Sequence, residues 1–161
     1  MDLFDNPPPV EIKLGGNTKE TARNAAEILL ALEQGYAVPS GAQRKNLLIA
    51  FAEQGLTLYG KAFDIVKGPT DLDLNDLDSI RKNFSNILIF EIKSTNKATV
   101  KPDFAGHFFS ISTAELLTAQ NLGSRYRFIF VNTLTKTTKE FSLQEVYAKA
   151  RGIYPSWSIQ F

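Results

Sequence analysis

The residues best suited to chemistry follow an apolar run at positions 87–90, where Glu91 and Lys93 flank Ile92. In a β-strand, residues two apart project to the same side, so a strand here would place the Glu91 carboxylate beside the Lys93 ammonium. Burying either charge alone would cost several kcal/mol, so the two groups need each other, a metal ion or an anionic ligand. The spacing therefore predicts a charged site on a buried strand.

A second acid, Asp64, stands in another short apolar stretch, residues 62–66. Two acids and a lysine on neighbouring strands suit metal-assisted hydrolysis of a phosphodiester. The acids offer hard oxygen ligands to Mg²⁺, and the lysine can orient or help to deprotonate water, or stabilise charge on the phosphate. Asp73, in the acidic segment 71–78, is a rival for the first acid. We favour Asp64 because its apolar neighbours would fix its position.

Together these residues resemble a known family. Asp64 followed by Glu91-Ile-Lys93 is similar to the PD-(D/E)XK nuclease superfamily, which includes many restriction endonucleases and DNA-repair nucleases. The likeness continues through residues 107–117 and a further strand near 126–132, and it covers about residues 60–135. One departure is Phe63, which stands before the first acid where the motif has proline.

The resemblance implies a Mg²⁺-dependent endodeoxyribonuclease, either a type II restriction endonuclease or its catalytic subunit, with Mn²⁺ able to replace Mg²⁺. Asp64 and Glu91 would bind the metal together with the backbone carbonyl of Ile92, and Lys93 would complete the catalytic set. Glu27, on a predicted helix, is a further candidate ligand, although an ordinary solvent-facing glutamate explains it equally well.

The expected substrate is double-stranded DNA, and several polar residues near the proposed site are candidate phosphate contacts. These are Ser94, Thr95, Lys97, Gln120, Arg125 and Arg127. One subunit of 161 residues offers one site. Cutting both strands would therefore need a homodimer or a larger DNA-recognition subunit. The alternative hypothesis is a non-catalytic DNA-binding or assembly module that keeps the same fold.

Composition narrows the other possibilities. The chain has 161 residues, 43% of them hydrophobic and 22% charged, which suits a single globular domain over residues 1–161. It has no cysteine and one histidine, which excludes thiolate-bound zinc and disfavours a Ser-His-Asp triad. The net charge of +1 says little about nucleic acid. No apolar stretch reaches the roughly 18 residues of a membrane span, so a cytoplasmic location is expected.

The positioning elements are predicted from apolar periodicity and helix-cap signals. Helices are expected at residues 17–34, 40–55, 112–122 and 142–152, with a short helix or loop at 70–83. A first strand or a hairpin is expected at residues 56–66, and further strands at 87–93, 107–111 and 126–132, with an extended arm at 1–16 and a terminal strand or tail at 157–161. This order predicts an α/β (α+β) fold with a mixed central sheet flanked by helices, restriction endonuclease-like by the resemblance. Glu115, three residues after Ser112, is interpreted as a helix cap without a catalytic role.

Overall fold

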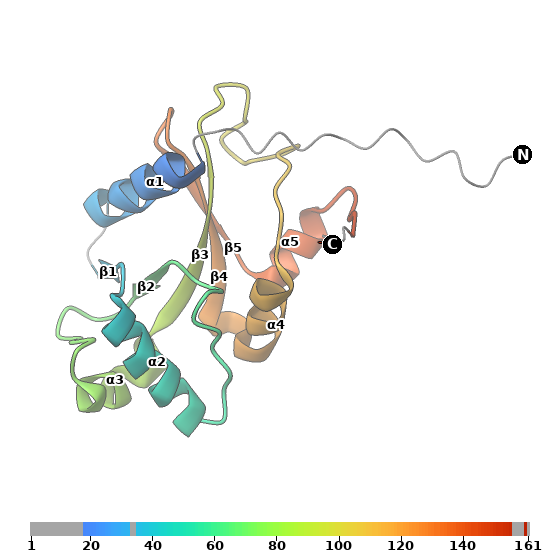
Figure 1. Cartoon of the computed structure of the whole chain (residues 1–161). Helices are drawn as coiled ribbons and strands as arrows, with labels where there is room; N and C mark the ends of the chain where they lie inside the picture. Colours follow the sequence, from blue (N-terminus) through green and yellow to red (C-terminus); the bar gives the residue numbers. More distant parts are fainter. Residues whose placement is uncertain (1–17, 33–34, 156–159, 161) are drawn as a thin grey trace, which may run out of the picture.

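The computed structural model describes residues 18–32, 35–155 and 160, and its centre is a five-stranded sheet in the order β1-β2-β3-β4-β5 (Figure 1). The strands are β1 (Tyr36–Ala37), β2 (Ile65–Lys67), β3 (Leu88–Thr95), β4 (Tyr126–Asn132) and β5 (Thr137–Phe141). β3 and β4 run parallel, whereas the other neighbouring pairs are antiparallel. The sheet is therefore mixed, which confirms the predicted α/β class.

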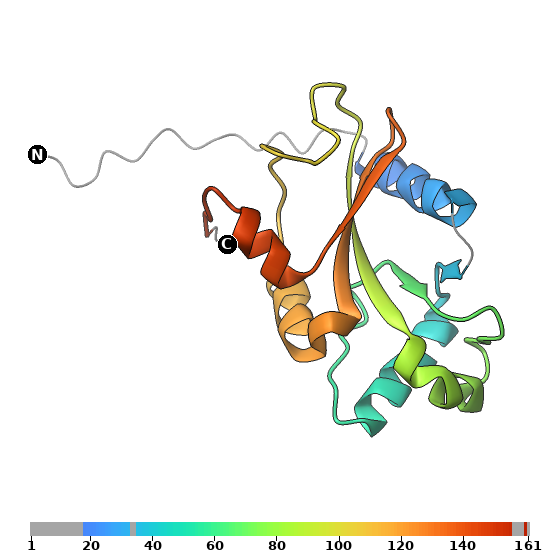
Figure 2. The same ribbon diagram turned by 180° about the vertical axis from the view of Figure 1, so that it is seen from behind.

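Helices pack on both faces of this sheet, as the opposite views of Figures 1 and 2 show. They are α1 (Thr18–Leu32), α2 (Gly41–Glu53), α3 (Leu77–Asn83), α4 (Thr113–Leu122) and α5 (Leu143–Lys149), with 3-10 turns at Phe84–Asn86 and Gly123–Arg125. On one face, Ala25 and Leu29 of α1 meet Phe90 and Ile92 of β3. On the other face, α2, α3 and α4 build the larger core. Because β3 and β4 are parallel, a long crossover through α4 joins them.

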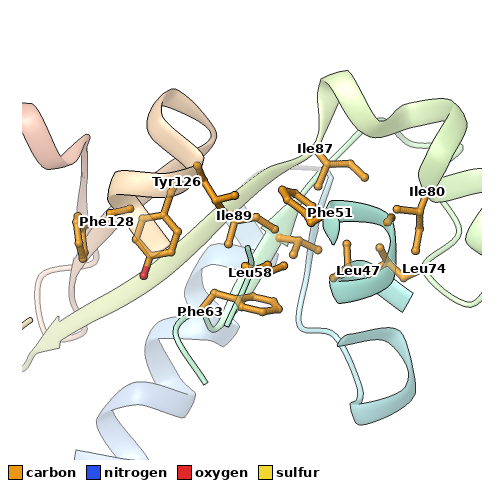
Figure 3. Packing of buried hydrophobic residues seen from close by; sticks show 14 of the residues in the cluster. Leu47, Phe51, Leu58, Phe63, Leu74, Ile80, Ile87, Ile89, Tyr126 and Phe128 are labelled. Atoms are coloured by element: carbon orange, nitrogen blue, oxygen red, sulfur yellow. The ribbon is translucent and has the colours of Figure 1, made fainter. Parts of the chain in front are cut away.

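The larger core joins Phe51 of α2 to Ile89 of β3 and Phe128 of β4, all three of them fully buried (Figure 3). Side chains alternate along β3, so Ile89, Glu91 and Lys93 project to this face, and the residues between them project toward α1. The strand is buried on both sides by apolar packing. Its two charged residues are consequently held in one direction.

Most predicted elements are confirmed, with small differences at their ends. β4 coincides with the strand predicted at 126–132, and β3 extends the strand predicted at 87–93 to Thr95. The capping boxes that open α2, α4 and α5 are all present, at Ser40, Ser112 and Ser142. The helix predicted at 17–34 is α1, whose predicted first and last residues lie outside the described residues. The arm at 1–16 and nearly all of 157–161 also lie outside them.

The strand predicted at residues 107–111 is wrong, because this segment pairs with no strand of the described sheet. Its apolar alternation has another cause. Phe109 and Ile111 pack on the core from a loop, and the ring of Phe109 meets that of Phe130 at 4.6 Å between centroids. Of the strand or hairpin predicted at 56–66, only the last two residues are in a strand, as the start of β2. β1 and β5 were not predicted.

The core position Phe128 should be far more sensitive to truncation than an exposed phenylalanine. Phe128 is 0% exposed and Phe108 is 65% exposed. We expect Phe128→Ala to lower the free energy of unfolding by about 3–5 kcal/mol through lost packing and a residual cavity. Phe108→Ala should change it by less than about 1 kcal/mol. Urea denaturation followed by circular dichroism measures both, and equal effects would contradict this assignment of the core.

Candidate functional site

Asp64 and Glu91 lie close together where β2 meets β3, because the charge of Asp64 acts on the Glu91 carboxyl. The antiparallel register of the two strands ends at the pair of Ile65 and Phe90, and Asp64 directly precedes β2. The Asp64 N–H donates to the Phe90 carbonyl at 2.9 Å, and its carboxylate Oδ2 accepts from the Ile92 N–H at 2.9 Å. The Asp64 carboxylate thus accepts a backbone hydrogen bond from β3, which fixes it beside the strand that carries Glu91.

Lys93 lies between two carboxylates. Its Nζ donates to Glu91 Oε1 at 3.1 Å and to Glu115 Oε2 at 2.7 Å. The same Glu115 oxygen accepts the Ser112 N–H at 3.1 Å, which closes the capping box of α4. The start of α4 is therefore tied directly to the lysine of β3.

These charges are largely removed from water. The side chains of Glu91, Lys93 and Glu115 keep only 11%, 12% and 12% of their surface exposed. Burial raises the pKa of Glu91 to about 8 against the opposing charge of Lys93, and the carboxylates of Asp64 and Glu115 act in the same direction as burial. The Glu91 carboxyl is thus proton-bound near neutral pH while no further cation is close.

Glu115 behaves differently from Glu91. Burial by itself would raise its pKa, but the hydrogen bond and charge of Lys93, together with the Ser112 N–H, lower it overall. Lys93 therefore pairs mainly with ionised Glu115. The Glu91 carboxyl is the group of the cluster whose ionised form burial disfavours most.

A buried tyrosine supports the chain that leads to Asp64. The Tyr126 hydroxyl on β4 donates to the Ala62 carbonyl at 2.5 Å. Burial raises the pKa of Tyr126, and the carboxylates of Glu91, Glu115 and Asp64 raise it further. The phenol therefore keeps its proton and serves as a fixed donor close to the acidic cluster.

The structure does not bring the other candidate acids into this cluster. Glu27 is exposed on α1, which covers the opposite face of the sheet, and it pairs with Arg23 at 3.7 Å. This separation corrects its proposed place beside Asp64 and Glu91. Asp73, the rival first acid, accepts the N–H and the side-chain amide of Asn75 in its own exposed loop.

The candidate DNA contacts fall in different places. Ser94, Thr95 and Lys97 lie at or just beyond the end of β3, and Lys97 is exposed. Gln120 is exposed on α4, on the side turned away from the buried residues of that helix.

The two arginines already have protein partners. Arg125 donates to the Phe84 carbonyl at 2.6 Å and stacks on the Phe84 ring. Arg127 projects to the sheet face opposite Glu91, because it is next to Phe128 on β4, and it pairs with Glu140 at 3.5 Å. Neither guanidinium is directed at the acidic cluster.

Glu115 is the residue that reasoning from the sequence missed. The Ser112-x-x-Glu115 spacing predicts the helix cap correctly, but it does not reveal the second contact of Glu115. The same oxygen also receives Lys93, which is distant in sequence. No local pattern carries this contact, because it depends on how α4 packs on the sheet.

Within residues 18–32, 35–155 and 160, no three Asp, Glu, His or Cys side chains form a group that could hold a metal ion by themselves. A hollow of about 310 Å³ lies between α1 and β5 on the other face. No helix among the described residues has the length and apolar character to cross a membrane.

Comparison with family models, curated proteins and solved structures finds no match to this chain.

The raised pKa of Glu91 predicts a pH-dependent loss of stability. Between the ordinary value of 4.5 and about 8, the folded chain binds more protons at Glu91 than the unfolded chain does. Its contribution to the free energy of unfolding is therefore complete below pH 4.5 and falls as pH rises through about 8. Glu91→Gln, which cannot ionise, should be more stable than the parent at pH 9 by a few kcal/mol in order of magnitude.

Urea denaturation at several pH values between 5 and 9 measures this effect. Glu53→Gln is the matched control, because Glu53 is on the surface and its hydrogen bond with Arg81 lowers its pKa. That variant should show no gain in stability as pH rises. A constant difference between Glu91→Gln and the parent over the whole range would contradict the prediction.

Proposed function

We propose that this protein is a Mg²⁺-dependent endodeoxyribonuclease that hydrolyses phosphodiester bonds of double-stranded DNA, as a type II restriction endonuclease or its catalytic subunit. One observation carries the proposal. The Asp64 carboxylate accepts the Ile92 N–H of β3 and lies near Glu91, and Lys93 donates to Glu91 from two residues further along β3. This is the set of groups that metal-assisted phosphodiester hydrolysis uses.

The donor set suits a hard divalent cation. Glu91 and Glu115 contact the Lys93 ammonium and Asp64 lies near Glu91, so two negative charges would be in excess if all three carboxyl groups were ionised. A divalent cation would balance that excess, and Mg²⁺ commonly uses one or two carboxylates with water filling its other positions. Asp64 and Glu91 would hold it, with the Ile92 carbonyl as the further proposed ligand. When bound, Mg²⁺ stabilises the charge that develops on the phosphate.

Lys93 is the group proposed to act on water or phosphate. Its ammonium carries three hydrogens, and two of them are directed at Glu91 and Glu115. The third is available to orient the attacking water or to bind a phosphate oxygen. Because Glu115 is itself fixed by the Ser112 N–H, the lysine is held in place before any substrate arrives.

The order of elements supports the proposed relation to PD-(D/E)XK nucleases. The strand with the E-x-K residues, β3, is followed by α4, whose first turn carries an acid, and then by β4 parallel to β3. The resemblance implies this order, although the strand expected at residues 107–111 is missing from it. We therefore propose a restriction endonuclease-like sheet.

The proposed substrate is double-stranded DNA, and the proposed assembly takes account of the number of sites in one chain. One site per chain cuts one strand, so duplex cleavage would use a homodimer or a larger subunit that recognises the DNA sequence. Exposed Lys97, just beyond the end of β3, is the residue that we propose contacts a phosphate next to the one that is cut, whereas Thr95 is buried and accepts the Lys97 N–H.

Plasmid cleavage with Mg²⁺ tests the proposal. Glu91→Ala and Lys93→Ala should each lower the cleavage rate by about a hundredfold or more, since each removes a group that acts on the developing charge. Glu27→Ala should cut at the parent rate, because Glu27 is exposed on the opposite side of the sheet. Gel electrophoresis of timed samples with Mg²⁺, Mn²⁺ and EDTA gives the rates.

Two outcomes would overturn this assignment. If Glu91→Ala and Lys93→Ala cut as fast as the parent, the cluster is not the active site. If the parent binds many DNA substrates in EDTA but cuts none with Mg²⁺ or Mn²⁺, the chain is a DNA-binding module. Thermal unfolding of each variant separates loss of chemistry from loss of folding.

A further inference from the structure

Arg44 of α2 makes an unusual set of contacts with the chain just before β2. Its Nη1 donates to the carbonyls of Gly60 and Phe63, at 3.0 and 2.7 Å, and its Nη2 donates to the carbonyl of Asp64 at 3.3 Å. The guanidinium carbon also lies 4.5 Å from the centre of the Phe63 ring. One side chain thus holds the backbone immediately before and at the first acid of the proposed site.

This stretch needs such a partner. Residues 56–64 form no strand, so the sheet does not supply hydrogen-bond donors to their carbonyls in a regular ladder. Buried carbonyls without donors are costly, and Phe63 is 2% exposed. The planar guanidinium presents several N–H groups in a fixed fork, which a flexible ammonium does not. The site is therefore adapted to arginine in particular.

The fork acts on the acid through the backbone. Arg44 fixes the Asp64 carbonyl, and on the same residue the carboxylate Oδ2 accepts the Ile92 N–H of β3. Arg44 is itself anchored by its own N–H, which donates to the Ser40 carbonyl at 2.8 Å in the first turn of α2. A continuous set of contacts consequently runs from the start of α2 to the Asp64 carboxylate.

We infer that Arg44 is a positioning residue that aims the Asp64 carboxylate at β3 and thereby sets the affinity of the site for a divalent cation. The inference rests on the proposed function for its link to the metal. The aiming of Asp64 can be measured without metal or DNA, because the Ile92 amide reports directly on that carboxylate.

Amide hydrogen exchange by NMR on the whole metal-free chain is the first measurement. Arg44→Met should speed exchange of the Ile92 amide about tenfold relative to the amides of β4, because the Asp64 carboxylate is no longer held against it. Arg44→Lys should do nearly the same, since lysine keeps the charge and loses the fork. Asp64→Ala gives the rate expected when the acceptor is absent.

The matched control is Arg125→Met. Arg125 also donates to a carbonyl and stacks on a phenylalanine ring, both of Phe84, but it does not contact Asp64. Its loss should leave the Ile92 amide unchanged relative to β4. The inference is overturned if Arg44→Met slows or speeds all amides alike, if Arg44→Lys leaves Ile92 fully protected, or if Asp64→Ala does not change Ile92.

Binding of Mn²⁺ to the metal-free chain, followed by electron paramagnetic resonance, is the second measurement. Arg44→Met should weaken binding about tenfold, and Arg125→Met should not. If the parent binds no Mn²⁺ but the Ile92 effect is present, the proposed function fails while the positioning of Asp64 by Arg44 stands. If the parent binds Mn²⁺ and cuts DNA, but Arg44→Met changes neither Ile92 exchange nor affinity, the positioning role fails alone.

Discussion

The structure depends on the burial of opposite charges beside an apolar strand. Lys93 and Glu91 project from β3, and Glu115 reaches them from α4, on the face that also holds the larger core; each of the three is about nine-tenths removed from solvent. Buried ion pairs seldom add net stability, because desolvation offsets much of their attraction. Replacing them with apolar residues would be expected to stabilise the fold. Their presence at this point is better explained by a function than by stability.

The register of two antiparallel strands determines which groups meet. β2 is only Ile65–Lys67, yet two of its residues are buried on opposite faces of the sheet. Ile65 packs with α1 and Val66 with the larger core, so a shift by one residue would exchange the two faces. That shift would also turn Asp64 away from Glu91. The apolar residues of β2 therefore fix the position of Asp64 through the strand register, while its carboxylate is bonded to Ile92 of β3.

Sequence reasoning reached the parts of the site that depend on local pattern. The apolar run before Glu91 predicted β3, and period-two alternation predicted that Glu91 and Lys93 share a side; both are present. The capping boxes were visible because each joins two residues only three positions apart. What remained hidden depends on packing between distant segments, as in the strand expected at 107–111, where aromatic residues cover the core from a loop. The placement of α1, and with it Glu27, also could not be read from its own periodicity.

The position of α1 explains why the additional acid of this cluster comes from a different helix. α1 uses Ala25 and Leu29 to cover Phe90 and Ile92, which alternate with Glu91 and Lys93 along β3. A helix that covers one set of side chains cannot also present an acid to the other set, because the sheet lies between them. The helix on the correct face is α4, and the acid in its first turn, Glu115, closes the capping box that satisfies its own backbone. Glu115 therefore serves two needs with one oxygen, and any movement of the start of α4 would be transmitted to Lys93.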